Sequence, residues 1–262
     1  MAPKLGRLAM SGKIQAYNFP QGVISHMYRD IAVGKPGTLT RVGIGTFVDP
    51  RIEGGKINKQ TTEDLVEVIT ISGEEMLFYK TYKVDVAIIR GTLADADGNI
   101  SMEKEALRID NLSQAMAAKN SGGVVITQLE RIVPAKTLSP GMVEVPSAMI
   151  DAIVLAKPEN YVQTYGTVYS AYLDGQDRAP SKKIKMTPLD ARKVIARRTA
   201  LELPFDGGVV NLGIGVPEGV AMVASEQNWL EAVTLTAEPG FIGTRFWNGG
   251  QHRCYHHTKS AI

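Results

Sequence analysis

The sequence predicts an α/β fold, and three features lead to this prediction. Short apolar segments bounded by glycine, proline or polar residues recur along the chain and are typical of strands. Segments with helical signals lie between them. Near the end of the chain, a strand, a glycine turn, a helix and a second strand follow one another within about thirty residues, the size of a β-α-β unit. Strands that alternate with helices build layered α/β domains.

The first predicted elements precede a hairpin. A strand over residues 13–18 is expected to lead into a turn, and a helix is expected over residues 22–32. Residues 34–58 are rich in glycine, proline and charge and have no clean period, which predicts a long functional loop. Apolar and polar residues then alternate over residues 65–79 on either side of a Ser-Gly pair, which predicts a hairpin.

The middle of the chain continues the alternation. Residues 84–89 form a predicted buried strand, and residues 95–99 (DADGN) a tight polar turn. The turn contains part of the EF-hand pattern, but a strand precedes it, which favours an Asx turn with its glycine at positive φ. A helix over residues 110–119 and strands over residues 124–128 and 148–155 complete this part.

The second half begins with a polar segment and a basic helix. Asp190 is the predicted N-cap of a helix that extends to residue 202. A short apolar strand over residues 209–212 is followed by glycines, by Pro217 where a helix is expected to begin, and by a strand that ends at Glu238.

Glu238 is the most informative residue of the chain. It lies at the end of the last of these strands and precedes Pro239 and Gly240, which stop the strand and leave the side chain at its end. Ligands bind at the carboxyl ends of strands in open α/β sheets. A single glutamate in such a place is more often a solvated charge, so the residues around it decide the interpretation.

The glycine turn between strand and helix supplies those residues. Gly213, Ile214 and Gly215 are expected to present backbone N–H groups toward a negative group. A dinucleotide site is an alternative, but the third glycine of its fingerprint is missing and Pro217 falls within the motif. A strand-end carboxylate beside such N–H groups indicates chemistry at a carbonyl.

The chain resembles the family I coenzyme A transferases, most of all their propionate/acetate CoA-transferase branch. The resemblance extends over roughly residues 3–243, and its motifs occur in the right order. The matching segments are residues 19–22 (FPQG), 45–56 (GTFVDPRIEGGK), 90–101 (RGTLADADGNIS), 133–136 (VPAK), 211–217 (NLGIGVP) and 238–243 (EPGFIG).

The resemblance implies transfer of CoA between a short-chain acyl-CoA and a carboxylate, with Glu238 as the nucleophile that carries CoA as a thioester. It implies that Ile214, Gly215 and Gly213 provide the oxyanion hole and CoA contacts, and that Gln21 orients the carboxylate substrate. It also implies homo-oligomers and no cofactor or metal, because CoA is itself a substrate. A catalytically inactive remnant and a nucleotide-binding oxidoreductase are the alternatives.

The resemblance further implies two related open α/β domains, both incomplete here. Residues 1–165 are expected to form the first domain, 166–186 a linker, 187–243 the start of the second domain, and 244–262 a tail outside the family pattern. An incomplete second sheet would leave an exposed edge, so we expect low solubility, early loss of structure on heating and CoA transfer near zero.

The tail allows two interpretations. His252, Cys254, His256 and His257 contain zinc-ligand chemistry, but their spacing fits no structural zinc pattern. A shifted reading frame or an interrupted gene explains the tail better, because the family's glycine-rich loop is missing at residue 244.

Composition excludes several other classes. The net charge is +2, from 29 basic and 27 acidic residues, and no basic cluster contains aromatic residues, so nucleic-acid binding is not expected. One cysteine excludes an internal disulfide and is typical of a reducing compartment. No apolar run reaches the length of a membrane span, so we expect a cytoplasmic protein without membrane partners.

Overall fold

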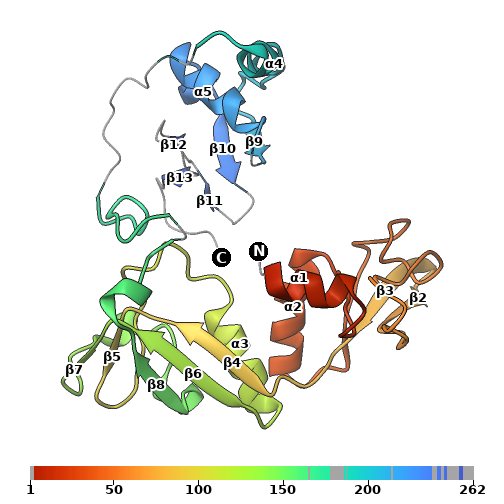
Figure 1. The fold of residues 1–262 in the computed structure, drawn as a ribbon, viewed down its shortest axis with the longest axis vertical. Coiled ribbons are helices and arrows are strands. Elements are labelled where there is room, and N and C mark those ends of the chain that lie inside the picture. The colour runs from red at the N-terminus through yellow and green to blue at the C-terminus, as the bar shows by residue number, and fades with distance from the viewer. Residues whose placement is uncertain are drawn as a thin grey trace. The chain divides into compact units, whose positions relative to one another are not determined.

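The chain forms two compact units in the computed structural model (Figure 1). One contains Met1–Met102 and Arg108–Ala156, and the other contains Glu103–Leu107 and Lys157–Ile262. The structure describes residues 3–164, 166–177, 186, 188–213, 215–237, 241–242, 245–246 and 254–255. The predicted domain and linker boundaries stay predictions.

An antiparallel sheet with two helices opens the first unit. Its helices are α1 (Pro3–Met10) and α2 (Gln21–Ala32), and its strands, in the order β1-β3-β2, are β1 (Gly37–Thr40), β2 (Val66–Ile71) and β3 (Glu74–Lys80). The predicted hairpin is confirmed, because β2 and β3 pair antiparallel across a turn where Ser72 and Gly73 adopt φ of 52° and 84°. Two consecutive residues at positive φ are typical of type I′ hairpin turns.

A parallel sheet follows in the same unit. Its order is β4-β6-β8, and α3 packs against it (Figure 1). The bounds are β4 (Val86–Arg90), α3 (Asn111–Asn120), β6 (Val124–Leu129) and β8 (Ala152–Leu155), with a smaller parallel pair of β5 (Leu93–Asp95) and β7 (Arg131–Val133). Single 3₁₀ turns occur at Pro140–Met142, Ser147–Met149 and, in the second unit, Pro158–Asn160.

Two apolar clusters hold the first unit together. Val23, Met27 and Ile31 recur every four residues on one side of α2, and this spacing gives the helix an apolar face that packs on Leu77 and Tyr79. The second cluster joins α3 to the parallel sheet through small and branched residues, among them Ala87, Ile89, Ala115, Ala118, Val125 and Leu129.

Several predictions for this unit are wrong in part. The strand expected over residues 148–155 is shorter, because β8 starts at Ala152 and a 3₁₀ turn occupies Ser147–Met149. No strand forms over residues 13–18, where only Tyr17 makes a bridge, to Lys56, because the strand length depends on a partner that the local sequence does not specify. The strand β4 is buried on one face alone, since Ala87 and Ile89 are buried whereas Val86 and Ile88 are exposed. The long loop also contains β1.

The second unit contains the predicted β-α-β arrangement. Its sheet has the order β11-β10-β9, in which β9 and β10 are parallel. The elements are α4 (Ala191–Ala200), β9 (Val209–Leu212), α5 (Glu218–Glu226), a 3₁₀ turn (Leu230–Ala232), β10 (Thr234–Ala237), β11 (Phe241–Ile242), β12 (Arg245–Phe246) and β13 (Cys254–Tyr255).

The predicted cap of α4 is also confirmed. Oδ1 of Asp190 accepts a hydrogen bond from the backbone N–H of Lys193, at 2.8 Å. In the described part of the tail, β12 and β13 pair antiparallel. Within the described residues, no helix has both the length and the apolar character needed to cross a membrane.

Candidate functional site

The two parallel strands of the second unit end side by side. Leu212, the last residue of β9, is paired in register with Ala237, the last residue of β10. The glycine turn therefore starts at the sheet edge at which β10 ends. Glu238 and Ile214 themselves lie outside the residues that the structure describes.

Two backbone features of the described residues shape the turn and the start of the helix. Gly215 adopts φ of 97°, a left-handed conformation that residues with a side chain rarely adopt. Pro217 then occupies the N-cap position and α5 starts at Glu218. The helix start supplies N–H groups without helical partners, and an anion is favoured there.

The strands beneath this edge are anchored on one face. Leu212 and Leu235 are buried and pack with Ala196 of α4 and with Val220 and Ala224 of α5. Because β9, α5 and β10 share this cluster, the helix start and the strand ends are held on one support.

The opposite face of the same strands carries a polar pair that the sequence analysis did not single out. The hydroxyl of Thr236 donates a hydrogen bond to Oδ1 of Asn211, at 3.2 Å. The two residues are directly opposite in the parallel register. The sequence signal for this pair was a polar residue on each of the two predicted strands. It could not show that the two residues lie opposite each other, because the register between strands depends on tertiary structure.

Gln21 is the first residue of α2 and belongs to the first unit. It is exposed and follows Pro20, whose extended backbone precedes the helix. Its predicted role in orienting a substrate stays a prediction.

The loop over residues 41–57 is organised by a buried carboxylate. Asp49 accepts backbone N–H bonds from Gly45 at 2.9 Å and from Arg51 at 3.0 Å. The Arg51 guanidinium also donates two hydrogen bonds to this carboxylate, from Nε to Oδ1 at 2.9 Å and from Nη2 to Oδ2 at 2.7 Å. Hydrogen bonds from the Arg51 side chain and the Gly45 backbone hold the pKa of Asp49 well below its usual range. Because Asp49 is buried, this part of the loop is not a fully solvated surface segment.

The same loop is tied to the hairpin. Nη1 of Arg51 lies 3.0 Å from Oε2 of Glu75, and Nζ of Lys56 lies 2.5 Å from Oδ1 of Asp64. The hydroxyl of Tyr79 donates to the backbone oxygen of Val42 at 2.8 Å, and burial raises the pKa of Tyr79 to about 12. The contacts of Asp49, Arg51 and Lys56 have structural explanations, Glu53 is exposed, and a role of the loop in walling the site stays a prediction.

Metal sites receive no support from the described residues. No group of three or more potential ligands from histidine, cysteine, aspartate and glutamate occurs among them. The carboxylate of Asp95 instead accepts the backbone N–H of Asn99 at 2.9 Å, and Gly98 has φ of 91°. This is the Asx turn that the sequence favoured over a calcium loop. His252, His256 and His257 lie outside the described residues.

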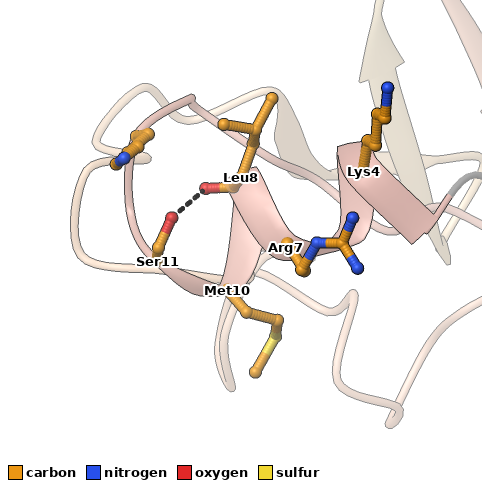
Figure 2. Close-up of a pocket in the computed structure, with 6 residues that line it drawn as sticks. Lys4, Arg7, Leu8, Met10 and Ser11 are labelled. Carbon is orange, nitrogen blue, oxygen red and sulfur yellow. Dashed lines mark hydrogen bonds between the residues drawn. The ribbon is translucent and has the colours of Figure 1, made fainter.

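A hollow beside α1 does not contain any predicted site residue. Figure 2 shows its lining, and its volume is about 720 Å³. The lining is basic and apolar, with Lys4, Arg7, Leu8, Met10, Ser11 and Lys13. Lys4, Arg7 and Met10 point away from one another in Figure 2 and form no convergent site.

Comparisons with known proteins agree on one family. The model of the coenzyme A transferase family matches residues 1–156. The caffeate CoA-transferase of Acetobacterium woodii is 49% identical over 237 residues, which cover 90% of this chain and 45% of that protein. The acetate CoA-transferase YdiF of Escherichia coli K12 is 37% identical over 242 residues, with 92% and 45% covered.

Solved structures show the same relationship. The crystal structure of the acyl-CoA transferase YdiF apoenzyme from Escherichia coli O157:H7 has a TM-score of 0.85 and 36% identity, and the match covers 97% of this chain and 48% of that one. A thioester complex of that enzyme with CoA has a TM-score of 0.84 and 35% identity. The chain spans about half the length of the relatives it matches.

Proposed function

The chain belongs to the coenzyme A transferase family, and we propose that it transfers CoA between an acyl-CoA and a free carboxylic acid. The observation that supports the proposal is the register of Leu212 with Ala237, the residues that precede the glycine turn and Glu238 in the sequence. The relative whose thioester complex with CoA is known supports a covalent route for that enzyme.

The proposed reaction uses a carboxylate of the enzyme twice. Glu238 attacks the thioester carbonyl, which releases CoA as a thiolate and leaves a mixed acyl-glutamyl anhydride. The thiolate then attacks the glutamyl carbonyl, so that the first carboxylate leaves and CoA remains on Glu238 as a thioester. A second carboxylate reverses these two steps, and the acyl-CoA product is released with Glu238 restored.

Each attack creates an oxyanion, and the glycine turn is the proposed receptor. The N–H groups of Ile214 and Gly215, with Gly213, would donate to it, while Gln21 would orient the incoming carboxylate. Losing one such donor typically costs about 3 kcal/mol of barrier. The proposal requires no metal or organic cofactor, so activity is expected to survive treatment with a chelator.

The acid substrate has two candidates. Acetate and propionate follow from the sequence resemblance, and acetate also occurs in the name of the YdiF relative. A larger aromatic acid is the second candidate, because the relative with 49% identity is a caffeate CoA-transferase. Rates with acetate, propionate and caffeate as acceptors distinguish them. A cytoplasmic location and a homo-oligomer remain part of the proposal.

Borohydride trapping tests the proposal directly. The chain is incubated with acetyl-CoA and reduced, and peptides are analysed by mass spectrometry. Reduction of a glutamyl thioester gives an alcohol, and we expect this change at Glu238 alone. Absence of modification at Glu238 would refute the covalent route and favour the inactive remnant.

A further inference from the structure

A buried ion pair joins the helices that support the glycine turn. Nζ of Lys193 on α4 lies 2.7 Å from Oε2 of Glu226 on α5, and the two side chains are 6% and 2% exposed. Lysine and glutamate are almost never fully buried unless they are paired. Such a pair therefore requires one relative placement of the two helices.

Helix stability does not explain the signs of this pair. Lys193 lies in the first turn of α4, and Glu226 is the last residue of α5. The helix dipole favours an acidic side chain at a helix start and a basic one at a helix end, so both charges oppose it. Replacing a buried ion pair by apolar residues is often neutral or stabilising, which makes stability a weak reason for its presence.

A second contact fixes the other end of α5. A Cβ atom added to Gly219 would lie 3.0 Å from Cβ of Ala196, so α4 and α5 approach closely there. The helix is thus located at its first turn by this approach and at its last residue by the ion pair. A slip of one residue would rotate α5 by about 100° and separate the charges.

We propose that Lys193 and Glu226 are positioning residues for the glycine turn. They set the rotation and axial position of α5, and through its first turn they set the direction of the N–H groups of Gly213 and Gly215. The inference rests on the proposed function, because that direction matters if these groups receive an oxyanion. Neither residue is proposed to touch substrate.

Three double variants test this proposal. Lys193→Met with Glu226→Leu removes the charges and keeps an apolar contact. Lys193→Glu with Glu226→Lys reverses the pair and agrees with both helix dipoles. The control, Arg198→Met with Glu202→Leu, removes an exposed i,i+4 ion pair from α4. Each is measured by thermal unfolding, by kcat and KM for acetyl-CoA, and by the amide NMR signals of Gly213 and Gly215.

We expect the apolar variant to unfold at or above the wild-type temperature while the signals of Gly213 and Gly215 shift. Its kcat should fall on the order of ten- to a hundredfold with little change in KM, because misplaced catalytic groups lower the rate of the chemical step. The reversed pair should restore the glycine signals and kcat, and the control should match wild type.

The outcomes separate this inference from the proposed function. Unshifted glycine signals and an unchanged kcat in the folded apolar variant would overturn the inference and leave the function standing. A wild-type chain without CoA transfer would refute the function, and the glycine signals alone would then decide the inference. If the apolar variant does not fold, failure of the reversed pair to reproduce the wild-type signals overturns it.

Discussion

Leu212 and Ala237 are the last residues of two parallel strands and lie opposite each other in register. Both strands therefore end at the same edge of the sheet, and ligands bind at the carboxyl ends of strands in open α/β sheets. In the sequence, Leu212 is followed by the glycine turn and Ala237 by Glu238.

Substitution of Glu238 by glutamine should abolish CoA transfer. The amide keeps the shape of the side chain but is not a nucleophile. We expect exchange of labelled CoA to fall to background while the free energy of unfolding changes by less than about 0.5 kcal/mol. Glu231→Gln, at an exposed glutamate just before β10, is the matched control and should keep its activity. Comparable exchange by Glu238→Gln would show that another group is the nucleophile.

The Asp49–Arg51 pair predicts a loss of stability in acid. The folded pKa of Asp49 is depressed below the ordinary value of 3.8, so its contribution is present above that pH and is lost as the pH falls toward the folded pKa. Urea unfolding between pH 7 and pH 2 should show this decline. The slope below pH 4 should be shallower in Asp49→Asn, and an identical slope would contradict the assignment.

Gly43 and Gly45 should respond differently to alanine. Both have positive φ, at 103° and 72°, so alanine strains the backbone at either position. A Cβ at Gly43 would also collide with Oη of Tyr79 and with Val48, whereas Gly45 has open space. We expect Gly43→Ala to lose about 1–3 kcal/mol more than Gly45→Ala, because overpacking adds to the strain. Equal free energies of unfolding would show that the loop adjusts freely.

Threonine substitutions at two neighbouring isoleucines of β4 should affect different properties, one solubility and the other the free energy of unfolding. Ile88 is 74% exposed and Ile89 is 2% exposed. We expect Ile88→Thr to raise solubility and leave the free energy of unfolding within about 0.5 kcal/mol of wild type. Ile89→Thr should cost about 2 kcal/mol or more, because it buries a hydroxyl and removes apolar contacts. Light scattering and urea unfolding measure the two effects. Strong destabilisation by Ile88→Thr would mean that this face is covered in solution.

The sequence by itself determined those elements whose signals are local. The hairpin follows from alternation around Ser72-Gly73, and α4 begins at Ala191 because the carboxylate of Asp190 caps a backbone N–H. The strand, glycine turn, helix and strand from Val209 to Ala237 were predicted in the same way, since each boundary carries its own glycine, proline or polar residue. The motifs in this part also led to the family.

Only the tertiary structure decided which residues meet. The strand expected over residues 13–18 shrank to one bridge at Tyr17, and one face of β4 remained exposed, because pairing and burial depend on partners distant in the sequence. For the same reason, the sequence did not predict the pairing of Lys193 with Glu226, 33 residues apart, or the register of Leu212 with Ala237. Local patterns specify a backbone conformation, whereas contacts between helices and strands arise from how their faces pack.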